Sequence, residues 1–209
     1  MSPQQRSSAA QARTALLIID MISCWDFEDA DRLLPGALRV TPHIAALKAR
    51  CRRAGVPVVY ANDNRGRWRS HFTALVEESI AASTPAARIT QALMPQEDDY
   101  FVLKPQLSAF FGTPLELLLA HLGVHRLIVT GVASDQCVLH TVADARMRDF
   151  DCVVPRDCVA SQTARRNDAV LMQVEETHKL KTTPGSRIVL AAPSRRRRAA
   201  ASTVGMPGD

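Results

Sequence analysis

The sequence Leu127-Ile-Val-Thr-Gly-Val-Ala-Ser-Asp-Gln-Cys137-Val-Leu-His140 contains the pattern that decides the fold. An apolar, β-branched run ends at Gly131, a short polar turn leads to Cys137, and apolar residues then recur with helical spacing. The pattern predicts a buried strand, a tight turn and a helix, with Cys137 in the first helical turn. We expect the N–H groups of that turn to stabilise a thiolate and a developing oxyanion. The alternative is a buried cysteine that only packs.

Similar alternation runs through the rest of the chain. Helices and apolar strands follow one another, which predicts a mostly parallel sheet of about six strands with helices on both faces, a three-layer α/β/α fold. The expected strands are residues 14–20, 56–61, 100–104, 127–131, 151–155 and 187–190. The expected helices are residues 41–54, 72–91 with a break at 84–85, 114–122, 138–148 and 164–179.

Length and charge favour one soluble domain. The 209 residues suit a single domain at 14–192, preceded by a disordered lead-in at 1–13 and followed by a basic, disordered tail at 193–209. The net charge of +5 comes largely from Arg195 to Arg198 in that tail, so we expect no nucleic-acid partner. No apolar run is long enough to cross a membrane, and the first residues lack the apolar core of a secretory signal.

The cysteine count bears on compartment and on metals. Five cysteines without a CxxC pair argue against a disulfide framework and a structural zinc site, and they favour a cytoplasmic protein. Asp63 and His71 are two candidate ligands without a third at a recognisable spacing, so we expect no metal. The turn after the first strand has no phosphate-binding glycine pattern, and we therefore expect no nucleotide or other cofactor.

Three expected strand ends carry reactive groups. Asp20 ends the first strand, Lys104 ends the third, and Cys137 follows the fourth. The carboxyl ends of parallel strands form the ligand-binding edge of such a sheet. A carboxylate can accept the proton of a thiol while an ammonium stabilises both anions, so we expect a catalytic triad of these three residues. Side chains from the neighbouring loops are expected to bind the substrate: Trp25, Phe27, Asn62, Arg65 and Trp68.

At these residues the chain resembles the isochorismatase-like cysteine hydrolases, which include nicotinamidases, N-carbamoylsarcosine amidohydrolases and isochorismatases. The matching motifs are Leu16-Leu-Ile-Ile-Asp20-Met, Val102-Leu-Lys104-Pro105 and Gly131-Val-Ala-Ser-Asp-Gln-Cys137-Val. The resemblance implies a Rossmann-like fold in which Asp20 is the general base, Lys104 supports it and Cys137 attacks a carbonyl carbon. It also implies a cis peptide bond before Ala133, an oxyanion hole formed by the N–H groups of Ala133 and Cys137, and a homo-oligomer, either a dimer or a tetramer.

Two features refine the expected reaction. Nicotinamidases carry an Asp-x-His metal motif after the second strand, whereas this chain has Asp63-Asn64-Arg65. Isochorismatases, which cleave a vinyl ether, lack the nucleophilic cysteine that is present here as Cys137. We therefore expect a cysteine hydrolase that cleaves a C–N bond of a small amide or carbamoyl-type substrate. The alternatives are an isochorismatase-type ether hydrolase and a non-catalytic binding protein on the same scaffold.

Overall fold

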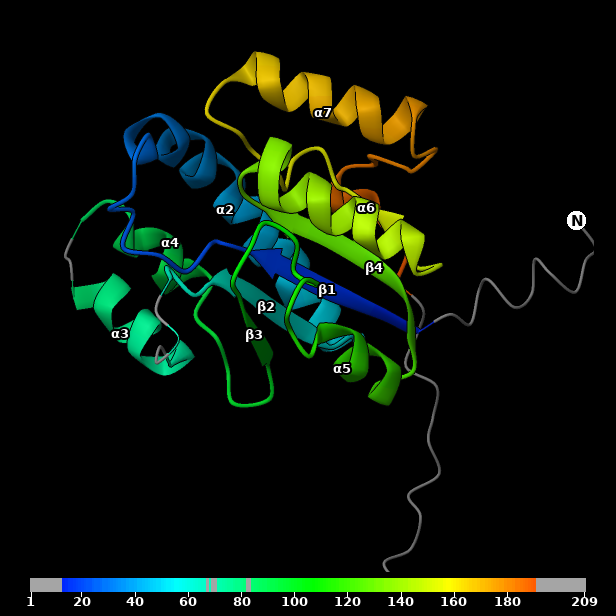
Figure 1. Cartoon of the computed structure of the whole chain (residues 1–209), viewed down its shortest axis with the longest axis horizontal. Coiled ribbons are helices and arrows are strands. Elements are labelled where there is room, and N and C mark those ends of the chain that lie inside the picture. Colours follow the sequence, from blue (N-terminus) through cyan, green and yellow to red (C-terminus); the bar gives the residue numbers. More distant parts are fainter. Residues whose placement is uncertain (1–12, 67, 69–70, 82–83, 191–209) are drawn as a thin grey trace, which may run out of the picture.

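A five-stranded parallel sheet forms the centre of the protein (Figure 1). The computed structural model describes residues 13–66, 68, 71–81 and 84–190. The strand order is β3-β2-β1-β4-β5, so β1 lies in the middle. The strands are β1 (Arg13–Ile19), β2 (Val58–Asp63), β3 (Tyr100–Lys104), β4 (Val124–Gly131) and β5 (Asp151–Val153). The predicted lead-in, apart from Arg13, and the predicted tail lie outside the described residues.

Helices cover both faces of the sheet, which confirms the predicted three-layer α/β/α class. In Figure 1, α6 lies in front of β4 while α2 passes behind the sheet. Alternate residues of β1 face opposite layers: Leu16 and Ile18 pack with α2, α3 and α4, while Leu17 and Ile19 pack with α5, α6 and α7. The helices are α2 (Ala30–Arg53), α3 (Phe72–Ala81), α4 (Ala87–Ala92), α5 (Leu115–His121), α6 (Leu139–Met147) and α7 (Ala164–Glu176). In the described part of the chain, no helix combines the length and apolarity that a membrane span requires.

The first helix is longer than the sequence predicted. We expected it to begin with Thr41 as its cap, but α2 begins at Ala30 and continues through Pro35 and Pro42. The hydroxyl of Thr41 donates to the carbonyl oxygen of Ala37, 2.7 Å away, and so does not cap a helix. Apolar residues at helical spacing continue on both sides of the prolines and are buried against the sheet. This packing outweighs the loss of a backbone hydrogen bond at each proline.

The predicted sixth strand at residues 187–190 is not formed. A 3₁₀ turn, η2 (Gly185–Arg187), ends at the first of these residues and packs on α2, and residues 188–190 have no regular secondary structure. The guanidinium of Arg50 donates to the carbonyl oxygens of Gly185 and Ile188, at 2.6 and 2.7 Å. These carbonyl groups are therefore satisfied by a helix side chain instead of a neighbouring strand.

Gly131 allows β1 and β4 to meet closely at the edge where Asp20 and Cys137 lie. Its φ is +113°, and a Cβ atom there would come within 2.0 Å of the carbonyl oxygen of Ile19. No side chain fits without separating the two central strands. Strand β4 therefore has to end in glycine.

We expect Gly131→Ala to lower the free energy of unfolding by more than about 3 kcal/mol, because it combines a strained φ with a backbone clash. Gly66 is the matched control: its φ is +68°, and no described heavy atom lies within 4 Å of a Cβ built there. Gly66→Ala should lower the free energy of unfolding by about 1 kcal/mol, because only the strained φ contributes there. Urea unfolding of both variants measures the difference. Equal losses of stability would show that the clash with the carbonyl oxygen of Ile19 does not contribute.

Candidate active site

The structure brings Asp20, Lys104 and Cys137 into contact. The ammonium nitrogen of Lys104 lies 2.9 Å from Oδ2 of Asp20 and 3.3 Å from Sγ of Cys137. The thiol also contacts the Asp20 carboxylate. The side chain of Lys104 is fully buried, and Cys137 is 8% exposed. A carboxylate, an ammonium and a thiol therefore form one closed cluster, which we call the Asp20–Lys104–Cys137 cluster.

Parallel strand pairing places Asp20 and Lys104 together. Asp20 directly follows β1, has a positive φ of 52°, and donates its N–H to the carbonyl oxygen of Ala61 on β2. Lys104 ends β3 and pairs in register with Asp63 of β2. Both residues therefore lie at the carboxyl edge of the sheet, one on each side of β2.

Cys137 lies in a tight turn between β4 and α6. The peptide bond between Val132 and Ala133 is cis, as the family resemblance implied. Residues Ser134–Val138 form a single π-helical turn that leads directly into α6. The N–H of Ser134 donates to the carbonyl oxygen of Ala160 at 2.7 Å, and the hydroxyl of Thr141 donates to the carbonyl oxygen of Cys137 at 2.7 Å. The turn is therefore held at both ends.

Burial and neighbouring charge determine the protonation of the cluster. Burial raises the pKa of Asp20 above its ordinary value, and the Lys104 ammonium offsets part of this rise. Burial alone would lower the pKa of Lys104, but the charges of Asp20, Cys137 and Asp63 outweigh it and raise the pKa. Lys104 is therefore a permanent cation beside a carboxylate that is a stronger base than usual.

The thiol differs from the sequence-based expectation of a stabilised thiolate. Burial, reinforced by the negative charge of Asp20, raises the pKa of Cys137 to about 12, and Lys104 offsets only part of this rise. The sequence argument considered the turn and its N–H groups but not the desolvation of the sulfur. Cys137 is therefore protonated in the resting protein, and its proton has to leave during the reaction.

The residues predicted to bind substrate lie in different environments. Asn62 is buried, and its amide donates to the carbonyl oxygen of Ile22 at 2.7 Å. Trp25 is nearly buried, with Phe27 tilted against it at a ring separation of 5.8 Å. The guanidinium of Arg65 forms an ion pair with Asp26. Trp68 is 81% exposed.

Asp63 is a site residue that the sequence analysis considered only as a metal ligand. Its N–H donates to Oδ1 of Asp20 at 2.7 Å, and its own Oδ2 lies 3.7 Å from Nζ of Lys104. Asp63 therefore contacts two members of the cluster. The sequence indicated only that Asp63 follows the predicted strand 56–61 at the ligand-binding edge; the structure extends β2 to Asp63 and places it beside Lys104.

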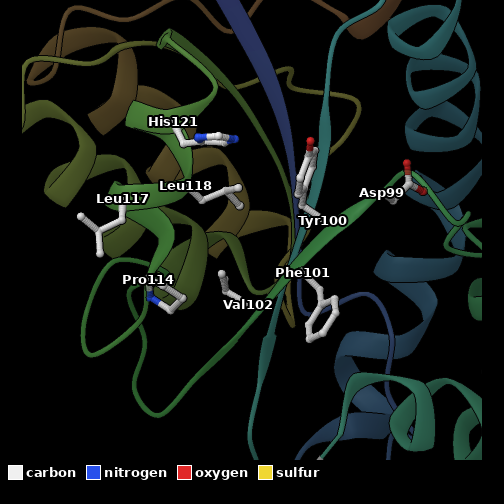
Figure 2. Close-up of a pocket in the computed structure, with 8 residues that line it drawn as sticks. All are labelled: Asp99, Tyr100, Phe101, Val102, Pro114, Leu117, Leu118 and His121. Atoms are coloured by element: carbon white, nitrogen blue, oxygen red, sulfur yellow. The ribbon is translucent and has the colours of Figure 1, made fainter. Parts of the chain in front are cut away.

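A surface groove lies apart from the Asp20–Lys104–Cys137 cluster. Among residues 13–66, 68, 71–81 and 84–190, no three His, Cys, Asp or Glu side chains are arranged to hold a metal ion. Figure 2 shows an open groove of about 470 Å³ between β3 and α5. Its lining is mainly apolar and includes none of the cluster: Asp99, Tyr100, Phe101, Val102, Pro114, Leu117, Leu118 and His121. The groove is therefore separate from the candidate active site.

The fold and the cluster at its carboxyl edge define an α/β enzyme with a buried thiol at the ligand-binding edge. The chain belongs to the isochorismatase family and is a hydrolase: the family's sequence model, described as "Isochorismatase domain", matches residues 14–183. This assigns nearly the whole described region to one family.

Curated relatives agree with this assignment. The chain is 36% identical over 166 residues to an uncharacterised isochorismatase family protein, YaaI, of Bacillus subtilis, covering 79% of this chain and 91% of that protein. It is 30% identical over 162 residues to the N-carbamoylsarcosine amidase of an Arthrobacter species, covering 72% of this chain and 60% of that enzyme. It is 27% identical over 174 residues to the maleamate amidohydrolase of Pseudomonas putida, covering 79% of this chain and 81% of that enzyme.

Solved structures share the fold. An isochorismatase-like hydrolase from Alkaliphilus metalliredigens superposes with a TM-score of 0.68 at 25% identity, over 85% of this chain and 96% of that one. The nicotinamidase of Staphylococcus aureus superposes with a TM-score of 0.64 at 22% identity, over 83% of this chain and 98% of that one. The second likeness concerns the fold alone.

We expect Lys104→Gln to make Cys137 react more slowly with iodoacetamide, since removing the ammonium raises the thiol pKa. Each unit by which the pKa rises lowers the thiolate fraction at pH 8 about tenfold. Mass spectrometry of the Cys137 peptide measures the rate, with the half-buried Cys24 as internal reference. An unchanged or faster rate in Lys104→Gln would contradict this account of the electrostatics.

Proposed function

We propose that the protein is a cysteine amidohydrolase that cleaves a C–N bond of a small amide or carbamoyl-type substrate through an acyl-enzyme on Cys137. The observation that carries the proposal is the contact of Lys104 Nζ with both Asp20 Oδ2, at 2.9 Å, and Cys137 Sγ, at 3.3 Å. An ordinary packed cysteine needs neither a base nor a cation, and burying these charges is costly. Relatives named as an N-carbamoylsarcosine amidase and a maleamate amidohydrolase also support C–N cleavage.

In the first half-reaction, Cys137 passes its proton to Asp20 as Sγ attacks the substrate carbonyl carbon. The N–H groups of Ala133 and Cys137 hold the oxyanion of the tetrahedral intermediate. Asp20 returns the proton to the leaving nitrogen, the C–N bond breaks, and ammonia or an amine departs. A thioester remains on Cys137.

In the second half-reaction, Asp20 takes a proton from water, which attacks the thioester carbon. The intermediate collapses, Cys137 leaves as the thiol with the proton returned by Asp20, and the acid is released. This acid is a carboxylic acid for an amide, and a carbamic acid, which loses CO₂, for a carbamoyl-type substrate. Lys104 keeps its charge throughout and holds Asp20 in place. The proposed reaction consumes one water per substrate and uses no cofactor.

The second candidate function is ether hydrolysis of the isochorismatase type, which the family membership favours. Direct water attack on an ether needs no thiol nucleophile. Replacement of Cys137 by alanine therefore separates the two functions, because ether hydrolysis should partly survive and amide hydrolysis should not. A non-catalytic binding protein would hydrolyse neither substrate.

We expect wild-type protein to release ammonia from at least one member of a panel of small amides, ureides and carbamoyl acids. Cys137→Ala should abolish this release, with a loss of at least about 10³-fold, because no other group can form the thioester. The matched control is Cys152→Ala, which removes a buried cysteine on β5 and should keep the activity. Activity on isochorismate without any amide turnover would replace the proposal with ether hydrolysis.

The pH dependence of kcat/KM provides a separate prediction. Because burial raises the pKa of Asp20, the acidic limb should have its midpoint above the ordinary aspartate value of about 3.9. Activity is lost as the pH falls through this midpoint, since a protonated Asp20 cannot accept the thiol proton. Lys104→Gln should move the midpoint to higher pH, because the ammonium lowers the pKa of Asp20. A midpoint that stays in place or falls would exclude Asp20 as the base.

A further inference from the structure

Asp63 contacts the Asp20–Lys104–Cys137 cluster but has no part in the proposed proton transfers. Its main chain and its side chain make separate contacts. The N–H holds Oδ1 of Asp20 at 2.7 Å, while the carboxylate faces Lys104 with Oδ2 3.7 Å from Nζ. The first contact is available to any residue at this position. The carboxylate therefore needs its own explanation.

Exposure increases from the sulfur towards Asp63. Lys104 is fully buried, Cys137 is 8% exposed, the Asp20 side chain is 17% exposed and the Asp63 side chain is 51% exposed. The cluster is therefore exposed to solvent mainly on the Asp63 side. Among the described residues that contact Lys104, Asp63 has the most accessible charged group.

The distances place this carboxylate within reach of a bound substrate. Nζ of Lys104 lies 3.3 Å from Sγ of Cys137 and 3.7 Å from Oδ2 of Asp63, so the carboxylate oxygen lies within about 7 Å of the sulfur, the sum of the two distances. A carbonyl carbon ready for attack lies roughly 3–3.5 Å from the nucleophile. Groups one or two bonds from that carbon can then approach Asp63 to hydrogen-bonding distance.

The two oxygens of Asp63 have different partners. Oδ1 accepts the N–H of Arg65 at 2.5 Å, which fixes the orientation of the carboxylate. Oδ2, at 3.7 Å from the ammonium, is beyond a direct hydrogen bond to Lys104. This oxygen can accept a hydrogen bond from a substrate N–H, and an acceptor of this kind discriminates strongly between a substrate that donates and one that does not.

We propose that Asp63 is a specificity residue whose Oδ2 accepts a hydrogen bond from an N–H next to the scissile carbonyl, so that the preferred substrates are ureido compounds, R–NH–CO–NH₂. The corresponding carboxamides, R–CH₂–CO–NH₂, leave this oxygen without a partner. The inference rests on the proposed C–N hydrolysis at Cys137. It assigns Asp63 to substrate recognition and leaves the proton transfers to Asp20.

The test compares an alkylurea with the carboxamide that has the same R group, in wild type and in Asp63→Asn. In the variant, the amide oxygen can still accept the N–H of Arg65, while an NH₂ group takes the place of Oδ2. A donor then faces the donor of the urea. We expect kcat/KM for the urea to fall at least tenfold more than kcat/KM for the carboxamide. Dividing the kcat/KM of the variant by that of the wild type for each substrate removes differences in intrinsic reactivity between the two substrates.

The control is Asp26→Asn, which removes another exposed carboxylate, the partner of Arg65. This variant should change kcat/KM for both substrates by the same factor. Equal losses on both substrates in Asp63→Asn would overturn the inference and show that Asp63 acts through Lys104. Turnover of neither substrate by wild type, with Cys137 still alkylated, would instead remove the proposed function and this inference with it.

Discussion

The buried ammonium of Lys104 is the interaction on which the functional part of this structure depends. A fully buried cation is tolerated where anions and dipoles surround it, and here Asp20, Asp63, Cys137 and the carbonyl oxygen of Gln106 do so. These partners come from the ends of β1 and β2, from the loop after β3 and from the turn after β4. The need to satisfy one charge therefore brings four parts of the sheet edge together.

The same cluster explains why a thiol with a raised pKa can serve as a nucleophile. A permanent thiolate beside Asp20 would place two negative charges in a buried site, with Lys104 as their shared cation. A neutral thiol next to a strengthened base avoids this cost and allows the proton to move as the carbon–sulfur bond forms. In this arrangement Lys104 favours the charged form of Asp20, while burial keeps that carboxylate basic.

The end of β2 departs from the Asp-x-His motif that the family resemblance ascribed to nicotinamidases. Asp63-Asn64-Arg65 takes the place of Asp-x-His, and the guanidinium of Arg65 forms an ion pair with Asp26. Asp63 is therefore placed beside Lys104 without a histidine partner in this motif. A carboxylate in this position is suited to accept hydrogen bonds from a substrate, which is the basis of the specificity inferred for Asp63.

The sequence by itself determined the fold class, because alternating apolar strands and helices specify a parallel sheet between two helical layers. It also predicted that Asp20, Lys104 and Cys137 meet, since residues that end parallel strands share one edge. It missed the continuation of α2 through Pro35 and Pro42, where burial against the sheet outweighs local propensity. It predicted a strand where Arg50 holds a 3₁₀ turn, a contact between residues far apart in the chain. The protonation of Cys137 and the placement of Asp63 were likewise decided by the tertiary structure, because desolvation and charge proximity depend on distances that spacing along the chain does not contain.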